Sequence, residues 1–400
     1  AASQTRRRTR CNSLRVRRSG SFAFPFRLTA FLFGDLMIGR IVACLSLCAL
    51  AACVSGREER IVCDRVLTFG EEPSPSVPDR IRRVDFLPLE FSEAAAFRRA
   101  DKLLFRNGLI YVGDFGSRKI VAYDMAGRVS FVIHRHGRGP GEYLEMKSFT
   151  ADDRNVYVVD NASRRVLLYD CRTGVFRESK PLPVVAWDIE ALHNGDFILA
   201  FSPLTGGTLS ESQPNYRLFV TDSDFAVKRR LFAFDPGYSE PLGRPTYFSV
   251  SGDSLVFSSF WFDGFTVFDR RDAVGFRHVA IDFARGIPGK YRQDRDAVLD
   301  GPYRYPVAVP VLCGDYVAVD VRCGEYLDTY LFDPAADAFI GNSETGAYLF
   351  PPVAVFEGRF VALLPGSSYA NLVEEGFPRA PDAVERNLNE DGNLLLFYGM

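Results

Sequence analysis

The sequence predicts an all-β fold, namely a six-bladed β-propeller of four-stranded antiparallel blades. Its 35 Phe and 17 Tyr against only 4 Met favour strands over helices. Residues 109–143 contain three short apolar runs separated by tight turns, a pattern typical of a β-meander. This meander recurs about six times, and a four-stranded blade needs roughly 40–50 residues.

Residues 1–36 are rich in arginine and contain no acidic residue before Asp35. One interpretation is a nucleic-acid-binding arm or an organelle transit peptide. We favour a second, a gene-model artefact upstream of a translation start at Met37. From Met37 onward the sequence is arranged like a signal peptide: Arg40 supplies a positive charge, and residues 41–50 are apolar but too few to span a bilayer.

Residues 37–52 are therefore predicted to be a lipoprotein signal peptide. They end in Leu50-Ala51-Ala52 before Cys53, which resembles the bacterial lipobox. This resemblance implies cleavage before Cys53 and a lipid on its sulfur, which would anchor the protein in the bacterial cell envelope. The next residue, Val54, favours the outer membrane. The alternative is an ordinary secretory signal followed by a chance cysteine.

Residues 53–78 are polar and contain three prolines, so we predict a tether between the lipid and a domain spanning 79–400. Beyond Cys53, the chain contains Cys63, Cys171, Cys313 and Cys323. The last two flank a predicted strand that would hold them roughly 30 Å apart, well beyond disulfide reach. No CxxC spacing indicates zinc, so we expect free thiols.

Two recurring landmarks locate the blades. The first is a turn followed by an apolar strand, as in Asn107-Gly108 before residues 109–114, and the second is an apolar strand ending in Asp. The predicted blades span 97–143, 144–187, 188–238, 246–291, 305–346 and 350–400. Residues 83–91 form a strand with no blade of its own. We predict that this strand pairs with the last blade and closes the ring.

A family resemblance follows from these repeats. The spacing Asp-x₃-Arg-x-(Ile/Val)-x₂-Tyr-Asp, present at 114–124 and 160–170, resembles the NHL-type propeller repeat. The sequences FLPLEF at 86–91, GRGPGEY at 137–143 and NEDGNLLLFYGM at 389–400 resemble the six-bladed β-propeller lipoproteins of Bacteroidota. The resemblance implies a propeller in the cell envelope and supplies no reaction.

Loop lengths predict which face of the propeller binds a ligand. With strands A to D counted from the inside outward, A–B and C–D turns share one face, while B–C loops and D–A connectors share the other. The long insertions, at 136–145, 202–215, 284–306 and 365–389, all belong to the second face. We therefore expect binding on this long-loop face.

Pro-Gly followed by tyrosine recurs within or beside these connectors, at 140–143, 236–238 and 288–291. One interpretation is a type II turn whose tyrosine packs between blades. The other is a ring of tyrosines and charges around the channel mouth that binds a glycan or peptide. Its candidate ligand-binding residues are Arg138, Glu142, Tyr143, Tyr238, Tyr291 and Arg292.

Signals for catalysis are weak. His134 and His136 alternate at a strand end, but no third ligand has the spacing of a metal site. The predicted inner strands contain Asp188 and Glu190 and few other oxygen ligands, whereas calcium needs several around one ion. We therefore predict a non-catalytic binding or scaffold module without a cofactor. A calcium-dependent lactonase, esterase or lyase remains the alternative.

The predicted partners follow from the net charge of the chain and from its predicted location in the cell envelope. A net charge of −2 argues against nucleic acid. We expect a monomeric domain that contacts the membrane through its lipid anchor and binds a small glycan, a peptide or a protein.

Overall fold

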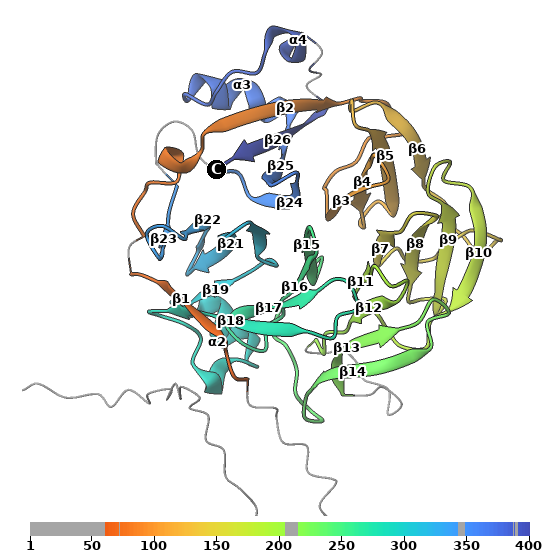
Figure 1. Ribbon diagram of the computed structural model, residues 1–400, viewed down its shortest axis with the longest axis horizontal. Helices are drawn as coiled ribbons and strands as arrows, with labels where there is room; N and C mark the ends of the chain where they lie inside the picture. The colour runs from red at the N-terminus through yellow and green to blue at the C-terminus, as the bar shows by residue number, and fades with distance from the viewer. Residues whose placement is uncertain (1–60, 72, 205–214, 343–348, 387, 389–390) are drawn as a thin grey trace, which may run out of the picture. The chain divides into compact units, whose positions relative to one another are not determined.

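The computed structural model describes residues 61–71, 73–204, 215–342, 349–386, 388 and 391–400. It confirms the predicted six-bladed β-propeller, with six sheets arranged around a common axis (Figure 1). The first strand of each blade is the innermost. Blade one contains β3 (Lys102–Arg106), β4 (Leu109–Asp114), β5 (Lys119–Asp124) and β6 (Val129–Ile133). Blade two contains β7 (Ser148–Ala151), β8 (Asn155–Asp160), β9 (Arg165–Asp170) and β10 (Phe176–Pro181).

The other blades follow the same pattern with local additions. Blade three contains β11 (Asp188–Ala191), β12 (Phe197–Ala200), β13 (Tyr216–Thr221) and β14 (Val227–Ala233). Blade four contains β15 (Phe248–Ser251), β16 (Ser254–Phe257), β17 (Gly264–Asp269) and β18 (Phe276–Phe283). Blade five contains β20 (Val311–Cys313), β21 (Tyr316–Cys323), β22 (Tyr326–Asp333) and β23 (Ala338–Ile340), with β19 (Arg304–Pro306) paired to the far half of β21. Blade six contains β24 (Pro352–Phe356), β25 (Arg359–Pro365), β26 (Asn393–Gly399) and β2 (Arg83–Leu89).

The ring closes as predicted, through a strand from the N-terminal side of the domain. Strand β2 pairs antiparallel with β26 along its whole length, from Arg83 opposite Gly399 to Leu89 opposite Asn393. Blade six therefore combines three strands from the C-terminal end of the domain with one from its beginning. Closure gives β26 a partner on both sides, so it presents no unpaired backbone groups for aggregation.

The aspartate that recurs at the end of five of the six C strands has a structural explanation. In five blades its side-chain oxygen accepts a hydrogen bond from the backbone N–H two residues later, at 2.9–3.0 Å. This Asx turn fixes the tight C–D connection. The residues concerned are Asp124, Asp170, Asp222, Asp269 and Asp333. They shape turns, so their recurrence is a signature of the fold.

One element departs from the sequence prediction. The segment 53–78, predicted as a tether, contains the strand β1 (Arg65–Phe69), which pairs in parallel with β18 as a fifth strand of blade four. Leu67 and Phe69 are each only 1% exposed, and the Phe69 ring lies 5.0 Å from that of Phe283. Residues 65–69 therefore belong to the folded domain, because two apolar side chains reach the seam between blades four and five.

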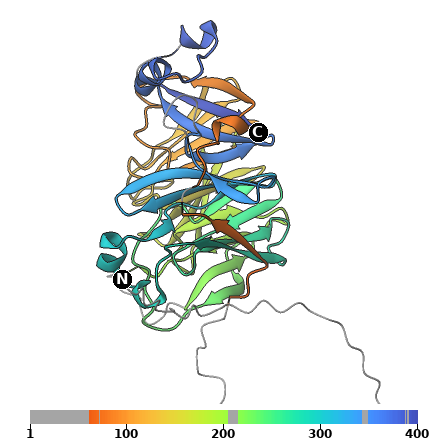
Figure 2. The same cartoon turned by 90° about the vertical axis from the view of Figure 1, so that its left-hand side faces the viewer.

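Short helices occupy the long connections. The insertion after β25 contains α3 (Gly366–Glu374) and α4 (Asp382–Glu385), which lie at the edge of the ring beyond blade six (Figure 2). The 3₁₀ helix η2 (Gly289–Tyr291) and α2 (Arg295–Asp300) connect blades four and five, and η1 (Pro78–Arg80) precedes β2. None of the helices in the described ranges is both long and apolar enough to cross a membrane. The four described cysteines are free, as predicted.

Candidate functional site

The inner strands of the first three blades bring opposite charges together at the propeller axis. Asp188 and Glu190 are two residues apart on β11, so both side chains point to the same side of the strand. Lys102, at the start of β3, places its Nζ 2.8 Å from each carboxylate. All three side chains are at most 4% exposed. We call these three residues the central charge cluster.

Neighbouring blades complete the hydrogen bonds of the cluster. The Ser148 hydroxyl donates to Asp188 at 2.5 Å, and the Thr150 hydroxyl donates to Glu190 at 3.0 Å. The backbone N–H groups of residues 247 and 248 donate to the other Asp188 oxygen at 2.7 and 2.9 Å. The cluster therefore ties together the inner edges of blades one to four.

Electrostatics keep the cluster charged. Burial alone would lower the pKa of Lys102, but the carboxylates of Asp188 and Glu190 outweigh this effect and raise the pKa. Burial would raise the pKa of Glu190, but Lys102 and the more distant Arg106 and Arg270 outweigh it and lower the pKa. Lys102 is therefore held as an ammonium and Glu190 as a carboxylate.

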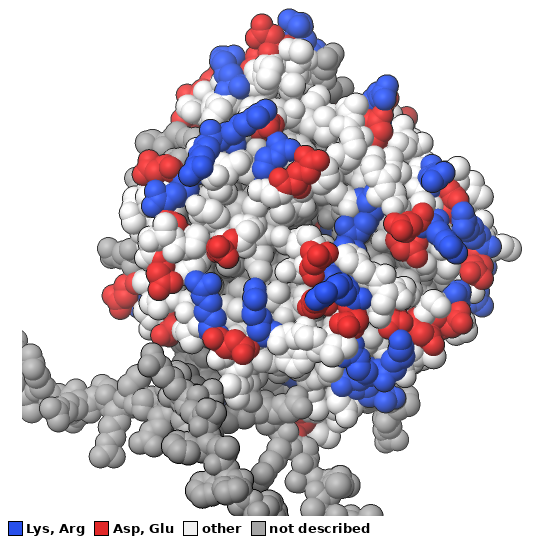
Figure 3. Space-filling view, viewed as in Figure 1, with Lys and Arg blue, Asp and Glu red and all other residues white. Residues whose placement is uncertain are grey.

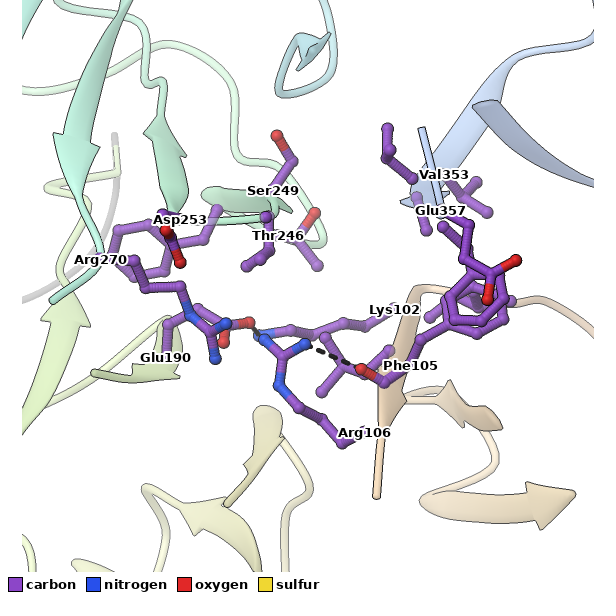
Figure 4. A pocket seen from close by; sticks show the side chains of 18 of the residues that line it. Lys102, Phe105, Arg106, Glu190, Thr246, Ser249, Asp253, Arg270, Val353 and Glu357 are labelled. Carbon is purple, nitrogen blue, oxygen red and sulfur yellow. Dashed lines mark hydrogen bonds and ion pairs between the residues drawn. The ribbon is translucent and has the colours of Figure 1, made fainter. Parts of the chain in front are cut away.

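A cavity of about 400 Å³ lies next to this cluster. We call it the channel pocket. Its walls come from the inner strands and adjoining turns of blades one, three, four and six (Figure 4). Arg106, His193, Asp253 and Glu357 lie in or beside A–B turns, whereas Asp101, Thr246 and Val353 lie at the opposite ends of the inner strands, so the pocket runs along these strands. The volume lies in the range typical of small-molecule sites.

Two arginines give the pocket its chemical character. Arg106 extends from the end of β3 and Arg270 from the turn after β17, and both point toward Glu190 and Lys102 (Figure 4). The Nη1 of Arg106 donates only to the adjacent backbone oxygen of Phe105 at 2.8 Å, while its Nε and Nη2 are buried without a partner. Arg270 is 7% exposed, and its Nε donates to the oxygen of Ala191 at 3.3 Å.

Neither arginine forms an ion pair with a residue in the described ranges. Burial and the nearby Arg106 lower the pKa of Arg270 to about 10, and Glu190 and Asp253 offset this only in part. The pocket thus holds guanidinium groups in a poorly solvated place with unused hydrogen-bond donors. Such an arrangement can bind an oxyanion.

The rim of the pocket, unlike its arginine-lined interior, carries acidic side chains that are exposed to solvent. The side chains of Asp253 and Glu357 are 81% and 68% exposed. Partial burial, followed by the charges of Arg270 and Arg106, lowers the pKa of the rim residue His193. Over the face seen in Figure 3, basic and acidic side chains are interspersed without one sign dominating. The unpaired positive charge of the channel pocket is therefore a local feature.

The structure does not gather the six predicted ligand-binding residues. Arg138 and Glu142 are exposed and line a shallow groove with the outer strands β9 and β10. Tyr143 is buried, donates from its hydroxyl to the oxygen of Arg118 at 2.7 Å, and has its pKa raised to about 12 by burial. Gly141 has φ +72°, as a type II turn requires.

The other three predicted residues make packing contacts near blade four. The guanidinium of Arg217 lies 4.7 Å from the ring centroid of Tyr238. Arg292 forms an ion pair with Asp263 at 2.7 Å. Tyr291 packs near Tyr303, and the residues Gly289–Tyr291 form η2, so Gly289 does not adopt the positive φ of a type II turn. The expected ring around the channel mouth is not formed, and a ligand-binding role for these six residues stays a prediction.

In the part of the chain that the structure describes, no group of three or more His, Cys, Asp or Glu side chains is arranged to hold a metal ion. The inner carboxylates of Asp188 and Glu190 are engaged by Lys102. Sequence reasoning identified these two carboxylates but missed Lys102, Arg106 and Arg270. The available signal was the spacing of Lys102 and Arg106, which puts both on one side of an inner strand.

The comparisons with known proteins define a family and a fold. The model of the family described as Domain of unknown function (DUF4934) matches residues 62–299. No curated protein matches the sequence.

Two solved structures are similar over most of this chain. A Bacteroides fragilis protein described as exported aligns with a TM-score of 0.66 and 17% identity, covering 84% of this chain and 99% of that one. A member of the duf4221 family from Bacteroides vulgatus aligns with a TM-score of 0.47 and 13% identity, covering 80% and 97%. At such low identity, the first likeness supports the fold alone.

Proposed function

The chain belongs to the DUF4934 family, and from that premise we propose that it is an exported bacterial binding protein whose ligand occupies the channel pocket. The observation that carries this proposal is the cavity of about 400 Å³ at the axis, lined by four blades and by two arginines, of which Arg106 has its Nε and Nη2 buried without a partner among the described residues. Buried polar groups without partners are rare in proteins, and at a concave site they indicate a ligand.

The proposed function does not include a catalytic activity. Among the hydroxyl groups of the lining, that of Ser249 donates to the backbone oxygen of Pro310 at 2.6 Å rather than to a basic side chain. The calcium-dependent enzyme remains a prediction that metal analysis of the purified protein can test. A stoichiometric ion that raises the melting temperature would favour it.

Envelope location is the second part of the proposal. It is supported by the lipobox-like residues before Cys53 and by the similarity to a Bacteroides fragilis protein described as exported. We expect the full chain to incorporate labelled fatty acid and to fractionate with the outer membrane. In the Cys53→Ala variant both properties should be lost. Retention of the lipid label by the variant would contradict anchoring at this residue.

The binding part is tested by blocking the pocket. We would screen oligosaccharides and dipeptides by thermal unfolding of the protein, because a ligand that binds only the folded state raises its melting temperature. Val353 lies at the pocket wall and is 37% exposed, so Val353→Trp should fill the cavity and abolish the shift. Val274→Trp is the matched control, since Val274 is 62% exposed and does not line the pocket. Binding that survives Val353→Trp would move the site to another surface.

A further inference from the structure

The charges next to the central charge cluster do not balance. Three cations, Lys102, Arg106 and Arg270, lie near two carboxylates, Asp188 and Glu190. The other buried carboxylate of the lining, Asp101, is paired with Arg99 at 2.5 Å. The two carboxylates are used by Lys102 and by hydroxyl and backbone donors. One positive charge therefore remains in excess where water is scarce, and an uncompensated buried charge is costly.

The buried arginine Arg244 has two short hydrogen bonds to neighbouring elements, although its Nε also has no partner. Arg244, which is 5% exposed, donates to the Ser258 hydroxyl and to the oxygen of Pro306, both at 2.7 Å. By contrast, Arg270 has a single long hydrogen bond, and Arg106 bonds only to the oxygen of the residue before it. The channel arginines thus make fewer and longer hydrogen bonds to neighbouring elements than Arg244 does.

Resting on the proposed function above, we propose that the channel pocket recognises small ligands through a single carboxylate, held between the guanidinium groups of Arg106 and Arg270. Guanidinium groups present paired donors that match the two oxygens of a carboxylate. A bound carboxylate would supply the missing negative charge and accept hydrogen bonds from the unused Nε and Nη2 of Arg106.

The charges also argue for one negative charge on the ligand rather than two. A carboxylate balances the single excess cation, whereas a phosphate monoester brings additional charge. The acidic rim residues Asp253 and Glu357 would repel that additional charge as the ligand enters. The expected class is therefore a small monocarboxylic acid.

The remaining walls suit the body of such an acid. Phe105 and Phe356 stack with ring centroids 4.4 Å apart, and Phe248 lines the pocket from blade four. Aromatic faces pack well against sugar rings and against apolar side chains. The carboxylate could therefore come from an acidic sugar or from the C-terminus of a short peptide, and the experiment separates these two sources.

The test compares acids with their neutral analogues by isothermal titration calorimetry on the folded domain. The probes are glucuronate and glucuronamide, and glycyl-phenylalanine with a free or amidated C-terminus. We expect one of the two acids to bind and its amide to bind at least tenfold more weakly, as for loss of a charged hydrogen-bonded contact. The acid that binds identifies the source, and inorganic phosphate and sulfate should bind more weakly than it does.

Variants connect this preference to the two arginines. Arg270→Gln and Arg106→Gln should each weaken acid binding about tenfold or more while the melting temperature stays near that of the wild type. Arg271→Gln is the matched control, because Arg271 is the adjacent residue and is paired with Asp269 at the surface. It should leave binding unchanged. If Arg270→Gln fails to fold, Arg270→Lys and Arg106→Gln carry the test.

The outcomes separate this inference from the proposed function. Equal binding of acid and amide, abolished by Val353→Trp, would overturn the carboxylate and keep the channel site. Stronger binding of phosphate or sulfate would also overturn it. If an acid binds and Val353→Trp leaves its binding intact, both the carboxylate inference and the channel site are overturned. Both are also overturned if no probe binds at millimolar concentration and no compound in the screen shifts the melting temperature.

Discussion

The central charge cluster and the channel pocket lie side by side on the propeller axis, yet the buried cations in them differ in how many ion-pair and hydrogen-bond partners they have. Lys102 is surrounded by two carboxylates at 2.8 Å and a backbone oxygen at the same distance. Arg270, almost as deeply buried, has one hydrogen bond of 3.3 Å and a lowered pKa. The comparison teaches that burial of a charge does not by itself reveal its role. A cation with complete partners holds blades together, whereas one with unused donors is available to a ligand.

The strongest way to test this comparison is to remove the paired cation. Lys102→Met should lower the free energy of unfolding by about 3–5 kcal/mol, because two buried carboxylates lose their counter-ion. Lys119→Met is the control, since Lys119 is 8% exposed but donates only to the backbone oxygen of Ala96. Urea unfolding followed by circular dichroism measures both. Equal losses for the two variants would show that the central charge cluster is not what stabilises the axis.

A second variant changes the residue shared by both regions. Glu190→Gln keeps the Lys102–Asp188 pair but removes one carboxylate, so we expect a loss of about 1–3 kcal/mol of unfolding free energy. The same change removes a negative charge beside Arg106 and Arg270, so acid affinity should rise. Denaturation and calorimetry on one preparation measure both effects. Weaker acid binding by the variant would contradict the electrostatic account of the pocket.

Removing the unpaired cation should affect stability least. Arg270→Gln gives up one long hydrogen bond but also relieves repulsion with Arg106, so the unfolding free energy should stay within about 1 kcal/mol of the wild type. Arg244→Gln, which loses partners in Ser258 and Pro306, should cost about 1–3 kcal/mol. The unfolding free energies of the two variants are compared from their urea midpoints, with the same dependence of free energy on urea concentration used for both. A larger loss for Arg270→Gln would assign this arginine a structural role.

The smallest expected effect is on the titration of His193. Since Arg270 and Arg106 help to lower its pKa, Arg270→Gln should raise that pKa, while His278, whose pKa is lowered by burial, should not change. The chain has only 4 His, so NMR can follow each one. A lowered pKa means that the folded state binds fewer protons than the unfolded state. Stability is therefore lost as the pH falls below the ordinary value of 6.5, and this loss should be smaller in the variant.

Features that depend on local pattern were accessible from sequence. The recurring aspartate, the turn pairs and the lone strand at 83–91 correctly predict six blades and their closure, because Asx turns and meanders are encoded within a few residues. Strand β1 was missed because its five residues carry no repeat signal, and its pairing with β18 joins segments far apart in the chain.

The site was harder to predict for a related reason. Loop length favoured the long-loop face, whereas the pocket is lined by the inner strands and by the short A–B turns at one end of them. Arg270 and Arg271 are neighbours in sequence, but one is 7% exposed and the other is paired at the surface. Only the geometry of the ring distinguishes them, because the inward direction at that turn is set by how blades three and four pack.

Ring closure through β2 and β26 also determines when, during synthesis of the chain, the domain can complete its folding. Residues 83–89 are made early in synthesis, and their partners at 393–399 only when almost all of the domain has left the ribosome. Until then blade six lacks β26 and the ring cannot close. A chain of this kind therefore stays incompletely folded while it is being made. A protein that must cross a membrane through a narrow translocation pore before folding would gain from this delay. Late pairing of β2 with β26 is thus compatible with the export that we propose for this protein.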